Sequence, residues 1–458
     1  MDLNSDKRQK TSGDSLTTGA GEAQHRRKRE TESLPTIDEN ESPTDSERMM
    51  EEICEWENLK AAMWQVKANK GSAGIDGKTV DELPDYRELV GIREQLLMGT
   101  YTPRPVKRVE IPKPDGGVRK LGIPTVLDRL VQQAVMQVLQ KHWDGMFSNS
   151  SFGFRPGRSA HQAVAQAQEY IAAGYGWVVD LDLEKFFDRV NHDKLMGQIA
   201  KRIRDKRLLK LIRAFLNAGV MENGLVSPSV EGTPQGGPLS PLLSNVVLDE
   251  LDRELERRGH RFVRYADDCN IYVRSEKAGQ RVMESVKRFI TKRLKLKVNE
   301  QKSAVARPQM RKFLGFSFTD GPEIRRRIAA KAVERFKDQI REITRKARSR
   351  SLAKTMSVLA PYMQGWRGYF GFCETPDVLI QLTGWVRRRL RAALWRQWKT
   401  PHRRRVMLFR LGVRGALAHD TAASSRGPWH IARTKALSIA LSNEYFRSRG
   451  FPSLYGRC

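Results

Sequence analysis

The chain has 458 residues, enough for about three domains of ordinary size, and 39% of them are apolar, enough to bury hydrophobic cores. It carries 82 Lys and Arg against 53 Asp and Glu, a formal net charge of +29, which favours binding to polyanions, either nucleic acid or an anionic membrane surface. The sequence has no run of about 18 apolar residues and no CxxC pair, so we expect neither a membrane-spanning helix nor a disulfide or zinc framework, and we predict a cytoplasmic protein.

The charge is unevenly distributed along the chain. Residues 325–458 hold 30 Lys and Arg against 7 Asp and Glu, whereas residues 1–50 hold 8 against 11. Residues 1–49 are rich in Ser, Thr, Glu, Asp and Gly and contain no aromatic side chain. Such a segment cannot bury enough apolar surface to offset its ordering entropy, so we predict a disordered polar tail. A phosphate-binding surface is expected toward the C-terminus.

The first ordered elements are predicted from about residue 50. Apolar residues of "EEICEWENLKAAMWQVKAN" recur near helical spacing, and a Gly-rich turn follows. "RPVKRVEIPKPDGGVRKLGIP" alternates apolar and basic residues about a Pro-Asp-Gly-Gly turn and predicts a β-hairpin. Residues 127–138 then have the pattern of a buried helix.

The middle of the chain predicts strands that end in carboxylates. "WVVDLDLEKFFDRVNHDKLM" begins as an apolar strand and becomes helical around Glu184. The Pro/Gly loop "GTPQGGP" leads into a helix with Ser240 as its N-cap and Pro241 at its first position. "RFVRYADDCNIYVRS" predicts a hairpin with Asp267 and Asp268 at its tip. Beyond Pro322 the chain becomes helical and basic, with an apolar stripe at Ile328, Ala332, Phe336, Ile340 and Ile343.

The paired aspartates have two interpretations. An isolated Asp-Asp turn is more often an ordinary solvated turn. A third carboxylate, Asp182, leaves a second strand in a matching setting. Three converging carboxylates repel one another unless a cation lies among them, and hard oxygen ligands suit Mg²⁺. Two such ions can clamp the attacking and leaving oxygens of an in-line displacement, which is the chemistry of a nucleotide polymerase.

Residues suited to a nucleoside triphosphate accompany these carboxylates. Lys113 and Arg119 flank the Pro-Asp-Gly-Gly turn, so a hairpin brings both to one tip. Taken alone, they are more often a solvated basic hairpin. Gln235 lies in "GTPQGG", whose glycines let backbone approach a ligand closely, although such a loop alone is more often a helix-entry turn.

These segments in order, "IPKPDGGVRKLGIP", "SSFGFRPGRSAHQAV", "VVDLDLEKFFDRVNHD", "GTPQGGPLSPLLSNVVLDELD", "RYADDCNIYV", "LKLKVNEQKS" and "FLGFSF", resemble the successive blocks of a reverse transcriptase. The closest resemblance is to the bacterial group II intron-encoded reverse transcriptase/maturases, and "PYMQGWRGYFGF" resembles their thumb-like maturase region. The resemblance implies an α+β right-hand polymerase. Fingers and palm would span residues 50–323, a helical thumb and maturase domain 324–400, and a basic DNA-binding segment 401–458.

The resemblance also implies roles for individual residues. Asp182, Asp267 and Asp268 match the catalytic metal-binding triad, and the backbone carbonyl of Leu183 would also reach a metal. Two Mg²⁺ ions are expected, with Mn²⁺ as an alternative. The nucleotide-binding residues implied are Lys113, Arg119, Phe187, Gln235 and Lys302, with Phe187 crowding the ribose 2′ position so that dNTPs are favoured. A core residue of a helix is the other interpretation of Phe187, and it does not exclude this role.

The basic C-terminal region predicts nucleic-acid contacts. "GWRGYFG" is interpreted equally well as packing between thumb helices and as direct RNA contact. Arginine runs interleaved with tryptophans suit a groove that binds phosphates and stacks bases. The candidate nucleic-acid contacts are Arg367, Arg387, Arg388, Arg389, Arg403, Arg404 and Arg405.

The resemblance has one departure. The tail lacks the clustered His and paired Cys of an HNH-type endonuclease, so we expect no second-strand-cleaving domain, as in the group IIC type. The partners implied are group II intron RNA, an RNA template with a DNA primer, target DNA and dNTPs, in a nucleoid-associated ribonucleoprotein of a bacterial cytoplasm. The alternatives are an RNA-binding splicing factor without polymerase activity and a related bacterial reverse transcriptase used in defence or repair.

Overall fold

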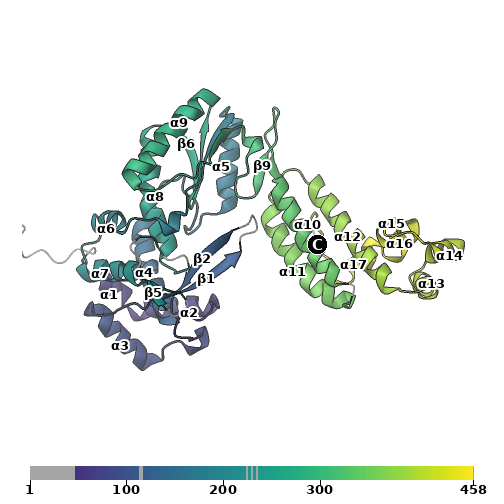
Figure 1. The fold of residues 1–458 in the computed structure, drawn as a ribbon, viewed down its shortest axis with the longest axis horizontal. Coiled ribbons are helices and arrows are strands. Elements are labelled where there is room, and N and C mark those ends of the chain that lie inside the picture. Colours follow the sequence, from purple (N-terminus) through teal and green to yellow (C-terminus); the bar gives the residue numbers. More distant parts are fainter. Residues whose placement is uncertain are drawn as a thin grey trace, which may run out of the picture. The chain divides into compact units, whose positions relative to one another are not determined.

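The computed structural model describes residues 47–112, 117–222, 225–227, 231–233, 236–347 and 349–456 (Figure 1). The tail predicted for residues 1–49 therefore lies almost entirely outside the described residues. Helices and strands are both abundant, and the three sheets contain mostly antiparallel pairs. The predicted α+β class is confirmed. No described helix is both long enough and apolar enough to cross a bilayer.

The N-terminal part combines helices with a small four-stranded sheet. The elements are α1 Met49–Ile53, α2 Trp56–Ala68, a 3₁₀ turn Val80–Glu82, α3 Tyr86–Leu97, β1 Val106–Pro112, β2 Val118–Ile123, α4 Val126–Trp143, a 3₁₀ turn Asp144–Met146 and α5 Ala160–Ala172. Strands β1 and β2 form the predicted antiparallel hairpin, with Ile111 opposite Arg119 near its tip. The helix predicted from residue 127 is confirmed as α4, which is buried along most of its length.

The central part contains the sheet that carries the predicted carboxylates. Its elements are β3 Trp177–Leu181, a 3₁₀ turn Phe186–Asp188, α6 His192–Ala200, α7 Lys206–Asn217, β4 Val220–Glu222, β5 Leu225–Ser227, α8 Ser240–Arg257, β6 Arg261–Tyr265, β7 Asp268–Val273, α9 Glu276–Phe289, a π-helical turn Ile290–Leu294 and β8 Ala304–Ala306. The strand order is β6-β7-β3-β8, and every neighbouring pair is antiparallel. We call this the palm sheet. Strands β4 and β5 instead extend the β1–β2 hairpin.

Helices cover both faces of the palm sheet because its strands alternate between two cores. Val179, Leu181 and Ile271 join the large core that includes α8 and α9, while Val178 and Tyr272 pack in a second core with α5. This period-two alternation is what a sheet buried on both faces requires. The strand ends are thereby held rigidly, which matters for the carboxylates they carry.

The C-terminal part is helical after a short two-stranded sheet. Its elements are a 3₁₀ turn Pro308–Met310, β9 Phe316–Phe318, β10 Arg326–Ile328, α10 Ala330–Lys346, α11 Leu352–Phe370, α12 Asp377–Gln397, α13 Pro401–Arg410, α14 Gly415–Ala423, α15 Pro428–Ile431, α16 Lys435–Ala440 and α17 Asn443–Arg447. One hydrophobic core runs from Ile328 through Phe336 and Trp395 to Leu454. The segment after residue 400 is therefore built onto the same core as α10–α12.

Local boundaries differ from the sequence predictions at four places. The predicted N-cap Ser240 is instead the first residue of α8, and Leu239 occupies the cap position without a side-chain hydrogen bond. The helix expected around Glu184 begins only with the 3₁₀ turn at Phe186. Ile328 belongs to β10 rather than to the stripe of α10. The first helical segment is divided at Cys54, where α1 ends before α2 begins. The described cysteines Cys54, Cys269 and Cys373 are free thiols.

Candidate active site

Three carboxylates lie at one end of the palm sheet. Asp182 directly follows β3, and Asp267 and Asp268 lie at the β6–β7 turn. Leu181 pairs with Cys269, so the residues that follow and precede them in the chain, Asp182 and Asp268, leave neighbouring strands at the same edge. The predicted convergence of Asp182 with Asp267 and Asp268 follows from this register.

Electrostatic coupling shows that these carboxylates are close together. Crowding by protein atoms, followed by repulsion from Asp267, Asp180 and Asp182, raises the pKa of Asp268 to about 7, although its side chain is exposed. Loss of hydration also raises the pKa of Asp267, with a further contribution from Asp182 and opposition from Arg119. Mutual repulsion of this kind is relieved by a cation.

The remaining contacts of Asp182 come from the loop before β8. The Ser303 hydroxyl accepts a hydrogen bond from the Asp182 amide at 3.0 Å, and the Asn299 amide donates to the Asp182 carbonyl at 2.8 Å. The Lys302 ammonium lies 3.6 Å from the Asp182 carboxylate. Lys302 therefore lies beside Asp182. Leu183 is buried beside Val298, with which it forms an isolated bridge.

A fourth carboxylate, Asp180, lies near this group but is paired with an arginine. Arg311 forms an ion pair with Asp180 at 2.6 Å and also donates to it from its Nε at 2.8 Å. Burial nevertheless raises the pKa of Asp180, and Arg311 opposes that rise. Asp180 is thus paired with a permanent cation. Among the described residues, no three or more His, Cys, Asp or Glu side chains are arranged closely enough to ligate one metal ion.

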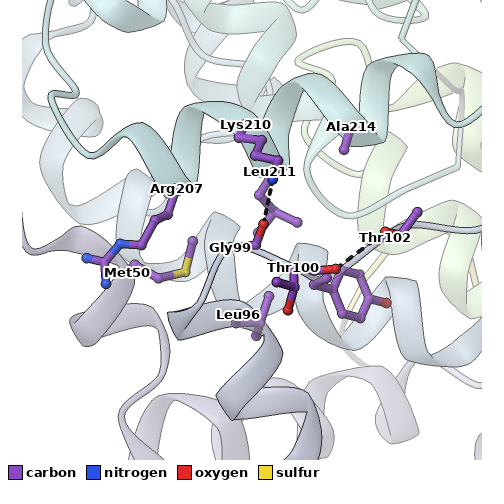
Figure 2. A pocket seen from close by; sticks show the side chains of 10 residues that line it. Met50, Leu96, Gly99, Thr100, Thr102, Arg207, Lys210, Leu211 and Ala214 are labelled. Atoms are coloured by element: carbon purple, nitrogen blue, oxygen red, sulfur yellow. Dashed lines mark hydrogen bonds between the residues drawn. The ribbon is translucent and has the colours of Figure 1, made fainter.

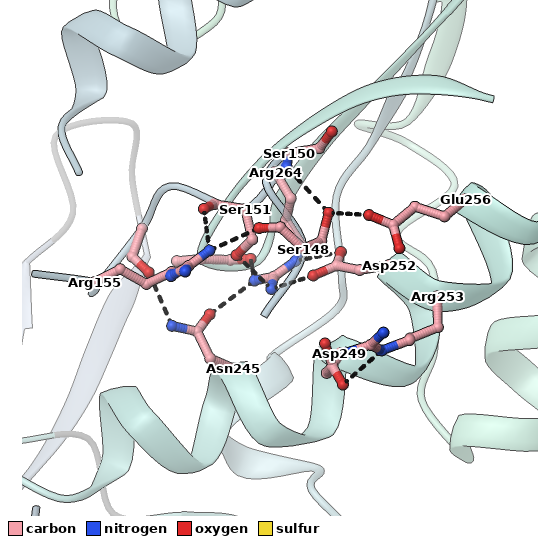
Figure 3. A network of polar contacts seen from close by, with 12 residues as sticks. Ser148, Ser150, Ser151, Arg155, Asn245, Asp249, Asp252, Arg253, Glu256 and Arg264 are labelled. Carbon is pink, nitrogen blue, oxygen red and sulfur yellow. Dashed lines mark hydrogen bonds and ion pairs between the residues drawn. The ribbon is translucent and has the colours of Figure 1, made fainter. Parts of the chain in front are cut away.

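A buried polar network supports the β6–β7 turn (Figure 3). Arg264 of β6 is fully buried and binds both carboxylate oxygens of Asp252, at 2.7 and 2.6 Å. It also donates to the Asn245 side chain at 2.9 Å, to Ser151 Oγ at 2.7 Å, and to the backbone carbonyl of Ala266 in the turn at 2.9 Å. Every nitrogen of the guanidinium is satisfied, so the β6–β7 turn is tied to α8.

Gly153 packs directly against the backbone of the same turn. A Cβ at Gly153 would lie 2.3 Å from the Ala266 nitrogen, a distance that no side chain tolerates. Ala266 itself has φ 57°, a left-handed conformation that is uncommon for a residue with a side chain. Sequence reasoning missed Arg264, Asp252 and Gly153; the spacing of Asn245 and Asp252, seven residues apart on α8, was the available signal.

The predicted nucleotide-binding residues are partly described. Arg119 on β2 is exposed, and its charge opposes the rise in the pKa of Asp267, so this residue of β2 lies near the carboxylates. Phe187 is half-buried, packs on the large core, and lies edge-on to Phe186 with ring centroids 5.2 Å apart. Its carbonyl accepts a hydrogen bond from Thr233 at 2.7 Å, which fixes the loop before α8. Lys113 and Gln235 lie outside the described residues.

The predicted nucleic-acid contacts separate into two groups. Several arginines bind their own protein: Arg388 stacks 3.7 Å from the Trp429 ring and donates to its carbonyl, Arg389 donates to Thr344, and Arg404 donates to the Trp398 carbonyl. Arg367 donates to the Ser453 carbonyl, and Arg387 is half-buried. Arg403 is exposed, and half-buried Arg405 has a polar contact with the His402 ring.

The "GWRGYFG" segment forms the end of α11 rather than a turn. Phe316 of β9 packs against Tyr369 and Phe370, and the Tyr369 hydroxyl donates to the Leu314 carbonyl at 2.8 Å. The ring nitrogen of His161 on α5 lies 2.7 Å from the Tyr369 carbonyl. These contacts favour the packing interpretation.

One cavity lies apart from the carboxylates (Figure 2). It has a volume of about 100 Å³ and is lined by Met50, Leu96, Gly99, Thr100, Tyr101, Thr102, Arg207, Lys210, Leu211 and Ala214. None of these is a predicted site residue. The cavity is too small for a nucleotide, and the candidate site remains the sheet edge that carries the carboxylates.

Two family matches cover successive parts of the chain. Residues 111–318 match the family described as "Reverse transcriptase (RNA-dependent DNA polymerase)". Residues 333–410 match the "Group II intron, maturase-specific domain". The chain thus contains a reverse transcriptase domain followed by a group II intron maturase-specific domain, and the palm sheet carries the reverse transcriptase fold.

Curated relatives agree with this assignment. The chain is 32% identical to the group II intron-encoded protein LtrA of Lactococcus lactis subsp. cremoris, over 54% of this chain and 53% of LtrA. It is 38% identical to protein YkfC of Escherichia coli K12, over 46% of this chain and 58% of YkfC. The chain is therefore homologous to LtrA and spans somewhat more than half the length of these two relatives. A solved structure titled "Partial Cas6-RT-Cas1--Cas2 complex" is 26% identical, covers 53% of this chain and 42% of that chain, and has a TM-score of 0.34.

Proposed function

We propose that this protein is an RNA-directed DNA polymerase that extends a DNA primer on an RNA template. The observation that carries the proposal is the convergence of Asp182, Asp267 and Asp268, with the pKa of Asp268 raised to about 7. A protein that only binds RNA gains nothing from concentrating negative charge beside a phosphate-binding surface. The reverse transcriptase family match over the same residues supports this assignment.

The donor set fits hard divalent cations. Asp182, Asp267 and Asp268, with the carbonyl of Leu183, would hold two Mg²⁺ or Mn²⁺ ions, which favour oxygen ligands. When bound, the ions would lower the pKa of the primer 3′-hydroxyl and neutralise charge on the triphosphate. Asp180 would not contribute, because Arg311 is already paired with it.

The other residues would position the nucleotide. Arg119, with Lys113, would bind phosphate oxygens, since a guanidinium offers two parallel donors. Lys302 lies beside Asp182 and would contact the triphosphate as a point charge. Phe187 would lie against C2′ of the ribose, and Gln235 along the nucleotide.

We further propose that the protein is a maturase for a group II intron RNA. The match to the maturase-specific domain and the homology to LtrA support this. The excess of basic residues beyond residue 325 would neutralise phosphates of the folded RNA and of target DNA. The domain division at residues 323 and 400 remains our proposal for how these activities are distributed.

Primer extension on an RNA template tests the polymerase. Asp267→Ala should abolish cDNA synthesis, and Asp188→Ala, which removes an exposed carboxylate of the same segment, should leave it nearly unchanged. Chelation of divalent ions should stop extension by the wild type. Full extension by Asp267→Ala would overturn the catalytic assignment.

An intron splicing assay with the same variant tests the maturase separately. Asp267→Ala should still promote splicing of the cognate intron, because the RNA would supply that catalysis and the protein would supply charge and a scaffold. Splicing that proceeds equally well without any protein would remove the maturase proposal while leaving the polymerase intact.

A further inference from the structure

The end of the palm sheet opposite the carboxylates carries a cluster of arginines and aromatic rings. Antiparallel pairing brings the start of β3, the start of β6, and the ends of β7 and β8 to this edge. Each of the four strands places an arginine or aromatic side chain at this edge. We call this set the arginine rim; its members are Arg261 of β6, Arg274 after β7, Tyr175 and Trp177 at β3, and Arg307 after β8.

The arginine side chains of the rim are ordered by the rings. The Arg274 guanidinium lies 4.9 Å from the centre of the Tyr175 ring, and that of Arg307 lies 4.6 Å from the centre of the Trp177 ring. Arg307 also donates to the Gly176 carbonyl at 3.2 Å. A Cβ at Gly176 would come within 2.9 Å of an Arg307 nitrogen, so glycine leaves the space that this guanidinium uses.

The third arginine, Arg261, joins Arg274 at the Tyr175 hydroxyl. Hydrogen bonding from Arg261, then from Arg274, lowers the pKa of Tyr175. All three arginines are exposed, while both rings are half-buried. Stacking therefore fixes two of the guanidinium planes while leaving donor edges at the surface.

Within the described part of the chain, no acidic side chain is paired with the rim. Among the residues that the structure describes, Arg261, Arg274 and Arg307 form no ion pair. By contrast, two exposed arginines of α8 are paired: Arg253 with Asp249 at 3.2 Å and Arg257 with Glu254 at 2.8 Å. Three unneutralised charges at one edge make a local site for an anion.

We propose that the arginine rim is a second nucleic-acid contact that binds a phosphodiester backbone away from the catalytic carboxylates. Planar guanidinium groups present parallel N–H donors that match phosphate oxygens, and pre-stacked arginines lose little rotamer freedom on binding. The rim lies at the far end of the strands that carry Asp182 and Asp268, so its ligand is not the primer terminus in the site. It serves to hold a bound nucleic acid on the body of the enzyme.

Salt-dependent binding to the full-length protein tests the rim. The probes are a blunt hairpin RNA and the DNA hairpin of the same sequence, neither of which offers a template overhang. In R261Q/R274Q/R307Q, the slope of log affinity against log salt should fall in magnitude by about 2–3, as expected for the loss of three phosphate contacts. A loss with RNA, with DNA or with both supports the contact and identifies which backbone it binds.

The matched control removes three charges that are already paired. R213Q/R253Q/R257Q changes arginines that form ion pairs with Asp193, Asp249 and Glu254, and it should alter the slope much less. Equal slopes in the two triple variants with both probes would overturn the proposal.

Two further readouts separate the rim from folding and from polymerisation. R261K/R274K/R307K keeps the charges and should recover most of the salt slope; a lysine variant as weak as the glutamine variant would assign the arginines to packing alone. Extension of a short primer on an RNA template should be unchanged in R261Q/R274Q/R307Q. Loss of extension would place the rim in the catalytic machinery and contradict a separate contact, whereas the polymerase proposal would stand.

Discussion

The β6–β7 turn and the C-terminal helices use charge in opposite ways. At the turn, Asp267 and Asp268 carry no ion pair in the described structure, while the arginine beneath them, Arg264, is completely satisfied inside the protein. In the C-terminal helices the arginines outnumber the carboxylates, and several bind backbone carbonyls and tryptophan rings instead. Runs of charged residues in the sequence do not distinguish these uses.

This difference shows which charged side chains are available to bind a ligand. A carboxylate whose pKa is raised by its neighbours is stabilised by an arriving cation. An arginine bound to a carbonyl already has part of its donor capacity occupied, and its removal affects the fold before it affects a ligand. Stability and ligand binding should therefore separate between the two regions.

The largest expected effect comes from breaking the buried support of the turn. Asp252→Asn leaves the charge of Arg264 buried without its carboxylate, and should lower the free energy of unfolding by about 3–5 kcal/mol. Denaturant unfolding measures this. Asp249→Asn removes a carboxylate paired with the exposed Arg253 and should cost about 1 kcal/mol or less. A cost below 1 kcal/mol for Asp252→Asn would show that the network does not support the turn.

The next effect concerns selectivity at the site itself. Phe187→Ala removes the ring proposed to lie against C2′, and should reduce discrimination between dNTPs and rNTPs by about 10-fold, a typical value for an altered pocket wall. The measurement is kcat/KM for the two nucleotides during primer extension. Phe186→Leu serves as the control. It alters the packing of the adjacent buried ring but keeps the Phe187 ring that is proposed to lie against C2′. Unchanged selectivity in Phe187→Ala would contradict the gate role.

The sequence predicted the exposed carboxylates of the site better than the buried residues that support them. Strand ends and hairpins follow from alternation and turn residues, so Asp182 and the Asp267–Asp268 turn could be placed in advance. The role of Gly153 could not, because it depends on the approach of a loop to a turn more than 100 residues away in the chain. Likewise, nothing in an arginine run shows that Arg388 faces Trp429 while Arg403 is exposed.

A smaller effect should separate arginines within the basic C-terminal region. Arg388→Ala removes a stacking contact and a hydrogen bond and should destabilise the protein by about 1 kcal/mol. Arg403→Ala, on the exposed face of α13, should leave stability unchanged and reduce the salt dependence of nucleic-acid binding by about one phosphate contact. Unfolding and binding measured on both variants check this. Identical effects of the two substitutions on both measurements would contradict the division.

The smallest effect concerns the pH dependence of stability in the metal-free protein. The pKa of Asp268 is about 7 in the folded chain, against an ordinary value of 3.8. Between these values the folded state binds a proton that the unfolded state does not, so this carboxyl makes the free energy of unfolding fall as pH rises. Asp268→Asn cannot ionise, so its stability relative to the wild type should rise between about pH 4 and pH 7, by about a kcal/mol or less because solvent screens an exposed group. Thermal unfolding in the presence of a chelator measures the difference, with Asp188→Asn as the control.

Added Mg²⁺ should reverse this pH dependence of stability, because the cation replaces the proton among the carboxylates. Parallel pH profiles with and without Mg²⁺ would mean that Asp268 does not bind the ion.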